Sequence, residues 1–464
     1  MSEKLLLREF GSSASSRWPL VNAFVLLSGG LLVFRAYANT ERIAFAAICA
    51  AIMLTGVIAL GAYISGAHAS KFELLSPPAT AAAIFVWYFF VVFAGSDRIL
   101  DVTLWYVLGS LITAGIVAFT AIAIYRPALL QTTRVTRRSV TSYLVAQALG
   151  ILLFVLLAKM GGFGSPLATF SNPLKFRAFL SGGGVTYFKL LADFLILMPV
   201  RMIALSDVRR LPWFLAGSLG VALAYTLATG SRGATVFLLL DLLLIAHLRR
   251  IRISILTVLF VVLVCIPFIV IYGEYRVAAQ FSRGNNDKII RFVENMKFQD
   301  ISRLTLRRID APFYFNLLMG SSGADDRQNW GASYLLLPLQ VVPRSMWPGK
   351  PYMPNSELSA RFVQSDMKVT FDFSIFGETF LGFGRAGWLV AGIIVAVCVV
   401  YSFSVYEIAY RTRAPAAILL AVSLWYAPAF VIIAGAVPAM IYVATQLAFF
   451  YAARSIFLSK EPGP

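Results

Sequence analysis

Long, uninterrupted apolar runs recur along this chain, and they restrict its fold more than any other feature. A run of about 20 apolar residues crosses a bilayer as a helix. Inside a bilayer the backbone must satisfy its own hydrogen bonds, so the alternatives are helices or a closed barrel. The runs do not alternate apolar and polar residues, which favours helices. With 59% hydrophobic and 13% charged residues, the chain is unlike a water-soluble domain. We expect an all-α polytopic integral membrane protein.

The runs predict about twelve transmembrane helices and one long loop. The helices divide the chain into residues 1–272 with helices 1–9, a loop at 273–386, and residues 387–464 with helices 10–12. The polar segment Met1–Arg17 is not expected to be a cleavable signal peptide. The expected spans are Trp18–Phe34, Ile43–Ile64, Pro78–Ala94, Val102–Tyr125, Thr141–Ala158, Val185–Ile203, Leu211–Ala228, Ala234–Leu248, Ile253–Tyr272, Trp388–Tyr406, Ala414–Ala434 and Pro438–Phe457.

Basic residues in short loops predict which ends of the helices face the cytoplasm. With both termini inside, the inward segments carry 18 Lys and Arg residues, including Arg201, Arg209, Arg249 and Arg250, against 7 in the short outward segments. Shifting the assignment by one span would invert this bias. The long loop then lies outside the cytoplasm. The short outward segments carry only Arg35, Arg42, Arg98, Lys159, Lys175, Arg177 and Arg232.

The long outer loop combines cations with carboxylates. Connections of this length are usually functional, and a basic pocket at the membrane face suits a lipid-linked phosphate or diphosphate. The segment Asp287–Asp310 has apolar residues at roughly helical intervals. The pattern predicts one or two amphipathic helices, which either lie on the membrane surface or pack on the rest of the loop with a solvated basic face.

The sequence TGSRGA (Thr229–Ala234) predicts a tight outward turn between two spans. Gly230 and Gly233 permit backbone angles that other residues avoid. The next helix begins here, so its first amides and Arg232 together can form an anion site. The alternative is a polar reverse turn with a snorkelling arginine.

Charged residues also occur inside the predicted spans. Lys189 and Asp193 are four residues apart on one helix and can form an ion pair. Asp241 lies in the middle of the eighth span, where a lone charge is costly. Both features are either functional or internal structural pairs. Cys49, Cys265 and Cys398 all fall in apolar spans and suggest no disulfide or metal cluster.

Three segments together resemble the oligosaccharide repeat-unit polymerases, the Wzy-type O-antigen and exopolysaccharide polymerases. They are TGSRGA, VVPRSMWPGKP (Val341–Pro351) and FSIFGETFLGFGRAGWLVAG (Phe373–Gly392). That family typically has Pro-Arg, an aromatic residue and Pro-x-Lys-Pro in a long periplasmic loop, followed by Gly-Glu and Phe-Gly-x-x-Gly before the next span. The number of helices and the single large loop are similar across the whole chain.

The resemblance implies a membrane glycosyltransferase of the GT-C type in the bacterial inner membrane. Such an enzyme transfers a growing glycan from undecaprenyl diphosphate to a new lipid-linked repeat unit at the periplasmic face, releasing undecaprenyl diphosphate. Its partners are the lipid-linked donor and acceptor, membrane lipids and a chain-length regulator, and no nucleic acid. No cofactor is expected, because the lipid diphosphate is the leaving group. The loop has no dense Asp/His motif, so no metal is expected either.

Departure of a diphosphate requires positive charge in the transition state. The prolines of VVPRSMWPGKP restrict the backbone and would hold Arg344 and Lys350 in place, unless this is a structural loop with basic decoration. The candidate diphosphate-binding residues are Arg232, Arg344, Lys350, Arg385 and Arg276.

The attacking sugar hydroxyl would give its proton to a base. No histidine lies on the outer face in this topology, so the candidates are carboxylates: Glu378 in the Gly-Glu motif, then Asp372 and Glu357. Glu378 could instead bind sugar hydroxyls or pair with an arginine. Trp347 and Tyr352 are candidates for stacking on sugar rings, with core packing as the alternative.

Two other functions fit the same architecture. An O-antigen ligase transfers glycan to the lipid A core, but ligases typically place a histidine in the outer loop. The histidines of this chain, His68 and His247, lie elsewhere. A flippase for lipid-linked oligosaccharide would use charges from many helices, and few charges occur within these spans.

Overall fold

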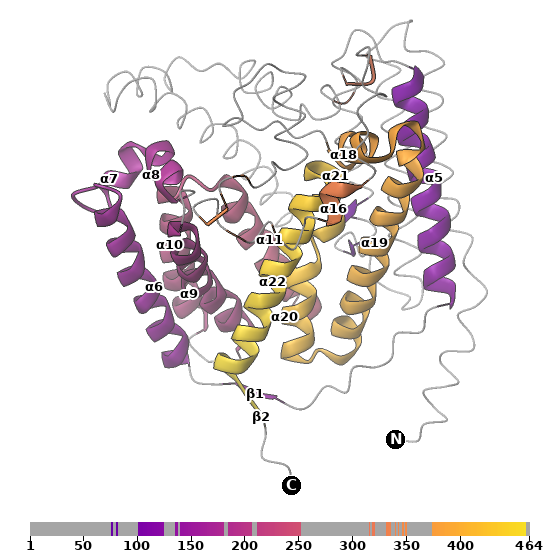
Figure 1. Cartoon of the computed structure of the whole chain (residues 1–464). Helices are drawn as coiled ribbons and strands as arrows, with labels where there is room; N and C mark the ends of the chain where they lie inside the picture. The colour runs from indigo at the N-terminus through magenta and orange to yellow at the C-terminus, as the bar shows by residue number, and fades with distance from the viewer. Residues whose placement is uncertain are drawn as a thin grey trace, which may run out of the picture.

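The computed structural model describes the helical body of the chain and short parts of the long loop (Figure 1). The described residues are 76–77, 80–81, 101–124, 135–137, 140–180, 184–206, 211–251, 315, 318–320, 331–335, 339, 342, 346–347, 349 and 374–460. Their elements are α5 (Asp101–Ile124), β1 (Val135–Arg137), α6 (Val140–Met160), α7 (Ala168–Ser171), α8 (Pro173–Leu180), α9 (Val185–Leu205), α10 (Leu211–Ala228), α11 (Arg232–Leu248), α16 (Ala332–Leu335), α18 (Ser374–Phe383), the 3₁₀ helix η4 (Gly384–Ala386), α19 (Gly387–Thr412), α20 (Pro415–Leu424), α21 (Ala427–Ala434), α22 (Ala436–Phe457) and β2 (Leu458–Lys460).

Helices occupy eight of the predicted spans, from α5 at Val102–Tyr125 to α22 at Pro438–Phe457. The spans Trp18–Phe34, Ile43–Ile64 and Ile253–Tyr272, and all of Pro78–Ala94 except residues 80–81, lie outside the described residues. The strands β1 and β2 were not expected. They pair antiparallel, with Val135 opposite Lys460, and join the residues after α22 to the α5–α6 connection. Within the described residues the fold is therefore helical apart from this one short ribbon.

Four of the described segments are long and apolar enough to cross a membrane: Val140–Met160, Ser374–Thr412, Pro415–Ala434 and Ala436–Phe457. Shorter apolar helices cover Trp105–Ala118, Trp213–Ala228 and Gly233–Leu248. On α6 the exposed residues Leu149, Leu152, Leu156 and Met160 follow one helical face. An apolar face that packs on nothing in the described structure fits contact with lipid.

Glycines allow the helices to approach each other closely. A Cβ on Gly150 of α6 would lie 2.6 Å from the Ile196 side chain of α9. A Cβ on Gly392 of α19 would lie 2.6 Å from the Ser110 carbonyl oxygen of α5. Small residues at such crossings bring backbones together, which is how helices associate where lipid removes the hydrophobic driving force.

The predicted span Ala414–Ala434 is broken into α20 and α21 near Trp425. Pro428 has no N–H to donate to the Leu424 carbonyl four residues earlier. The Ser402 hydroxyl of α19 donates to that carbonyl instead, at 3.0 Å. The break is therefore stabilised by a neighbouring helix, as membrane helices require.

The charges in the middle of the helices form a buried cluster. Arg201 donates to Asp241 Oδ2 through Nε at 2.9 Å and Nη2 at 2.6 Å, and to Gln446 Oε1 at 3.1 Å. Arg201 and Asp241 are 6% and 4% exposed. Arg201 was counted among the inward loop cations, which is wrong: it lies within α9 and is paired with α11 and α22. Without Arg201, the predicted inward segments still carry more Lys and Arg residues than the short outward segments, so the positive-inside bias remains.

The helices have two distinct ends. The backbones of α11 and α22 both begin at the end where α18 lies, which is the upper end in Figure 1. The β1–β2 ribbon lies at the opposite end. We call the first of these the α18 end. It is the end that the charge pattern predicts to be outside the cytoplasm.

Candidate functional site

The Glu378 carboxylate lies at the α18 end and binds the beginning of another helix. Its Oε2 accepts the N–H of Ala436, and its Oε1 accepts the N–H of Val437 at 3.1 Å. Glu378 is 2% exposed. The first amides of a helix lack partners within the helix, and a carboxylate is favoured there by the helix dipole. Glu378 therefore caps α22 from a position 58 residues earlier in the chain.

Gly435 makes this cap sterically possible. It ends α21 and precedes α22 with φ 96° and ψ 172°, a conformation that is essentially restricted to glycine. A Cβ on Gly435 would collide with Oε2 of Glu378. A side chain at Gly435 would therefore disrupt the contact between the α21–α22 corner and Glu378 of the Gly-Glu motif.

Two tyrosine hydroxyls lie near Glu378. Tyr106 Oη of α5 and Thr379 Oγ1 of α18 share a hydrogen bond of 3.0 Å. The buried Tyr334 hydroxyl of α16 has no hydrogen-bond partner among the described residues. Burial raises the pKa of Tyr334, and the charge of Glu378 raises it further, so the phenol keeps its proton. A buried donor without a partner is rare and marks a place where a polar molecule can bind.

The residue that begins α18, Ser374, has a left-handed backbone with φ 63° and is fully buried. Its Oγ accepts the Phe376 N–H at 3.2 Å, which provides a partner at the start of the helix. Non-glycine residues in this conformation are uncommon and cluster at functional sites. This unfavourable backbone conformation of Ser374 lies on the same short helix as Glu378, which caps α22.

The α10–α11 connection is the second part of the α18 end that the sequence singles out. Gly230 has φ 68°, its N–H binds Leu227 O at 2.9 Å, and the Ser231 N–H binds Thr226 O at 2.9 Å. This pair of bonds is the Schellman ending of a helix, which requires a left-handed residue at this point. Gly233 does not use the backbone freedom that glycine permits, because it is an ordinary helical residue of α11. Arg232 is the first residue of that helix.

The other predicted site residues are only partly described. Arg385 is exposed in η4, and Trp347 is half-buried. The described residues contain no group of three His, Cys, Asp or Glu side chains able to hold a metal ion. The side chain of Arg232 and the whole of Arg344, Lys350, Arg276, Tyr352, Asp372 and Glu357 lie outside the described structure.

Sequence reasoning missed Tyr334, Tyr106 and Arg177 as members of this end. Tyr106 lies in an apolar run that read as an ordinary span, and Tyr334 lies in the long loop with no motif around it. Arg177 was counted only as an outward cation. Its position on a short helix with buried Phe176 and Leu180 is a weak amphipathic signal that could have identified it.

Comparisons with known protein families, curated proteins and solved structures find no match to this chain. The class shown by the described structure is therefore a coarse one: a protein built from apolar helices, several of them long enough to cross a membrane.

Proposed function

We propose that this protein is a membrane glycosyltransferase that polymerises oligosaccharide repeat units carried on undecaprenyl diphosphate. It would act at the periplasmic face of the bacterial inner membrane, with both termini in the cytoplasm and about twelve spans in a GT-C-like arrangement. The products would be O-antigen, common-antigen or exopolysaccharide chains. The proposal starts from the three motifs that resemble the Wzy-type polymerases.

The observation that carries the proposal is that two of those motifs lie at the same end of the apolar helices. TGSRGA spans the α10–α11 turn and the first residues of α11, and the Gly-Glu motif lies on α18. Both the start of α11 and the Glu378 cap are at the α18 end. A lipid-linked substrate has its diphosphate at the membrane surface, so residues gathered at one end of spanning helices can reach it.

In the proposed reaction, a hydroxyl of the acceptor sugar attacks the anomeric carbon of the donor glycan. The bond from that carbon to the diphosphate oxygen breaks, and undecaprenyl diphosphate leaves with the bonding electrons. Arg232, Arg344 and Lys350, with Arg385 and Arg276, would stabilise the developing negative charge. The hydroxyl proton would pass to a carboxylate.

Among the candidate bases, Glu378 has the contacts of a structural residue, because each carboxylate oxygen accepts a backbone N–H. This geometry favours Asp372 or Glu357 for proton transfer, with Glu378 holding the site together. Tyr334, whose hydroxyl has no partner among the described residues, is then a candidate to bind a sugar hydroxyl.

The test is a reconstituted reaction. The purified protein in detergent is mixed with the lipid-linked repeat unit of its own host, and the products are separated by size. We expect a ladder of multiples of the repeat unit, lost in Arg232→Ala and Arg344→Ala variants that retain the wild-type unfolding midpoint. Lys159→Ala is the matched control, because Lys159 is an exposed cation in the last turn of α6.

Two outcomes would replace the proposal. A single glycan transferred to added lipid A core would identify a ligase. Movement of the lipid-linked unit across proteoliposomes without any glycan product would identify a transporter.

A further inference from the structure

The short helix α8 holds an arginine against the α10–α11 turn. Phe176 and Leu180 are 0% and 1% exposed, and Phe176 packs edge-on to Phe154 and Phe163 with centroids 5.9 and 5.3 Å away. This apolar anchoring leaves Arg177 on an exposed face. Arg177 Nη1 donates to the Gly230 carbonyl oxygen at 3.3 Å. The guanidinium therefore lies beside the turn from which α11 starts.

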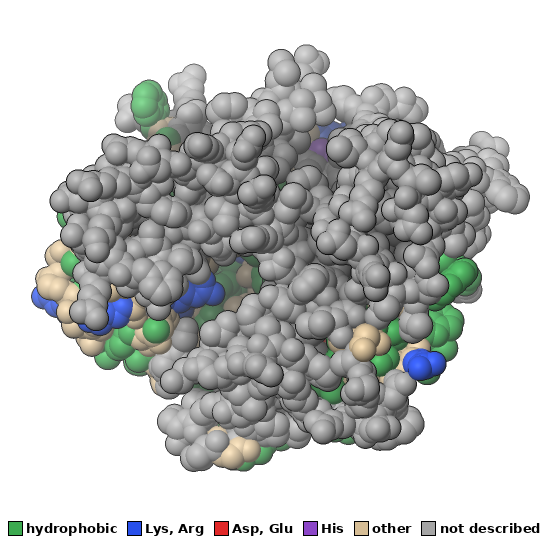
Figure 2. Space-filling view, turned by 90° about the horizontal axis from the view of Figure 1, so that it is seen from above, with side chains coloured by type: hydrophobic (Ala, Val, Ile, Leu, Met, Phe, Trp, Pro, Cys, Tyr) green, Lys and Arg blue, Asp and Glu red, His purple; other side chains and the backbone are tan. Residues whose placement is uncertain are grey.

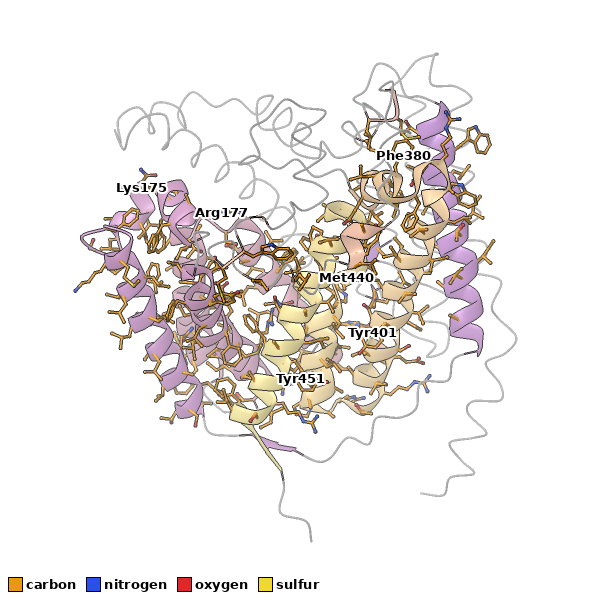
Figure 3. All side chains as sticks on the ribbon, viewed as in Figure 1. Lys175, Arg177, Phe380, Tyr401, Met440 and Tyr451 are labelled. Atoms are coloured by element: carbon orange, nitrogen blue, oxygen red, sulfur yellow. The ribbon has the colours of Figure 1, made fainter. Side chains whose placement is uncertain are left out.

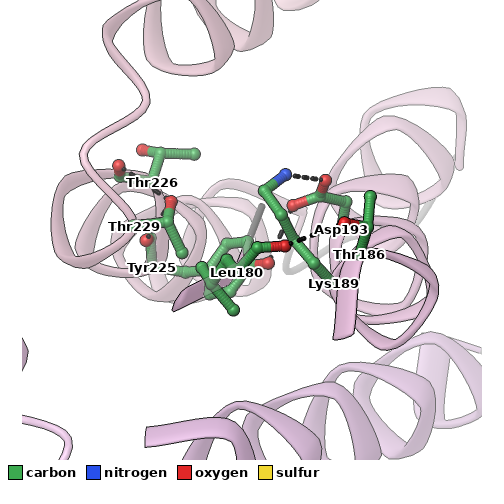
Figure 4. A network of polar contacts seen from close by, with 7 residues as sticks. All are labelled: Leu180, Thr186, Lys189, Asp193, Tyr225, Thr226 and Thr229. Atoms are coloured by element: carbon green, nitrogen blue, oxygen red, sulfur yellow. Dashed lines mark hydrogen bonds and ion pairs between the residues drawn. The ribbon is translucent and has the colours of Figure 1, made fainter. Parts of the chain in front are cut away.

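The turn itself is held firmly from the side of the helices (Figure 4). Tyr225 of α10 donates to Asp193 Oδ1 at 2.7 Å, and Lys189 binds Asp193 Oδ2 at 2.5 Å. The predicted Lys189–Asp193 pair is thus confirmed, with Tyr225 as a third member. Thr235 of α11 donates to Thr226 of α10 at 2.7 Å across the turn. Because these hydrogen bonds fix both α10 and α11 at the turn, hydrogen-bond donors beside the turn are already in position before a ligand binds.

Basic residues outnumber acidic residues in the described stretches of residues 140–251. Asp193 and Asp241 are the acidic residues within the described stretches of residues 140–251, and they bind Lys189 and Arg201. Arg177, and Arg232 at the start of α11, are further cations of this part of the chain. Figure 3 shows Lys175 and Arg177 at the α18 end, where Phe380 also lies. Seen from that end, Lys and Arg side chains lie on the side where Figure 1 has α7 and α8 (Figure 2).

We infer that Arg177 is a second guanidinium of the diphosphate site, oriented by its hydrogen bond to Gly230 and acting beside the start of α11. A guanidinium has five N–H donors in a planar fork, so it can hold a carbonyl oxygen and phosphate oxygens together. This inference rests on the proposed function for the identity of the ligand, which is a diphosphate on a lipid. The chemistry it names is recognition of a diphosphate at the membrane surface.

The helix provides a matched control two residues earlier. Successive helical residues are about 100° apart, so Lys175 lies about 200° around α8 from Arg177. Its ammonium group is 5.7 Å from the centre of the Phe163 ring. Lys175→Ala removes the same charge from the same helix without touching the α10–α11 turn.

The experiment measures binding by calorimetry with the full-length protein in detergent. The probes are farnesyl diphosphate, farnesyl monophosphate and inorganic diphosphate. We expect Arg177→Ala to weaken farnesyl diphosphate binding by about 10-fold or more, since a hydrogen bond to a charged group contributes about 1.5–3 kcal/mol and about 1.4 kcal/mol is tenfold. Lys175→Ala should leave the affinity unchanged. Preference for farnesyl diphosphate over inorganic diphosphate would identify a lipid headgroup as the ligand.

Arg177→Lys separates binding from folding, because lysine keeps the charge but not the fork. We expect weaker binding at an unchanged unfolding midpoint. Unchanged affinity in Arg177→Ala, or equal losses in Arg177→Ala and Lys175→Ala, would overturn the inference. If wild type forms the glycan ladder and Arg177→Ala binds normally, only this inference fails. If Arg177→Ala loses binding but no variant forms a ladder, only the proposed polymerisation fails.

Discussion

Replacing Glu378 by glutamine separates a structural carboxylate from a catalytic base. In the structure, the two carboxylate oxygens accept the N–H groups of Ala436 and Val437. A glutamine has one acceptor oxygen, so its NH₂ group would face the second N–H, donor against donor. The variant keeps the size of the side chain and changes only its hydrogen bonding and charge.

The expected loss of stability follows from this geometry. One buried N–H left without an acceptor costs about 1–3 kcal/mol. We therefore expect Glu378→Gln to lower the free energy of unfolding by about 1–3 kcal/mol.

The assay is a reversible denaturant titration of the purified protein in bicelles, followed by the fluorescence of its 8 tryptophans. Glu407→Gln is the matched control, because Glu407 pairs with Arg411 on the surface of α19. Such exposed pairs contribute about 0.5 kcal/mol or less. If Glu378→Gln unfolds like wild type but forms no glycan ladder, the capping explanation is wrong and Glu378 is the base.

Three further substitutions test other contacts by the same titration. Gly435→Ala should destabilise the protein by about 3 kcal/mol or more, because its φ of 96° is costly for alanine and the new Cβ collides with Glu378. Arg201→Ala should cost about 3–5 kcal/mol by leaving Asp241 buried without its arginine. Tyr334→Phe should change the unfolding free energy by less than about 0.5 kcal/mol, because the hydroxyl has no partner among the described residues, while the glycan ladder weakens.

For each of these three substitutions, a specific result would contradict the proposed explanation. Gly217→Ala is the control for Gly435, because a Cβ on Gly217 of α10 meets no atom within 4 Å. Equal effects of the two glycine substitutions would remove the steric explanation. Arg201→Met combined with Asp241→Leu should recover most of the lost stability, and no recovery would show that the ion pair is not the cause. Destabilisation by Tyr334→Phe would reveal a partner for the hydroxyl.

The positions of the helices could be predicted from the sequence because the cause is local. A span needs only enough consecutive apolar residues to match the bilayer, so α6, α10, α11 and α22 lie close to the segments read from the chain. The Lys189–Asp193 pair was predictable for the same reason, since one helical turn sets the spacing.

The partners of the polar residues could not be predicted, because they come from distant parts of the chain. Arg201 and Asp241 are 40 residues apart, and Tyr106 meets Thr379 across 273 residues. Apolar segments carry almost no information about which helix packs against which. Arg201 therefore looked like a loop cation, and Pro428 gave no hint that Ser402 replaces its missing donor.

Glu378 shows most clearly which properties follow from the sequence and which depend on the tertiary structure. The sequence alone determined that a carboxylate lies just before a spanning helix, in a Gly-Glu motif at the predicted outer face. Only the tertiary structure decided what that carboxylate binds, because the amides of Ala436 and Val437 reach it through the packing of α18 against the α21–α22 corner. Local spacing specifies helices, whereas the contacts between them depend on three-dimensional packing that no single segment encodes.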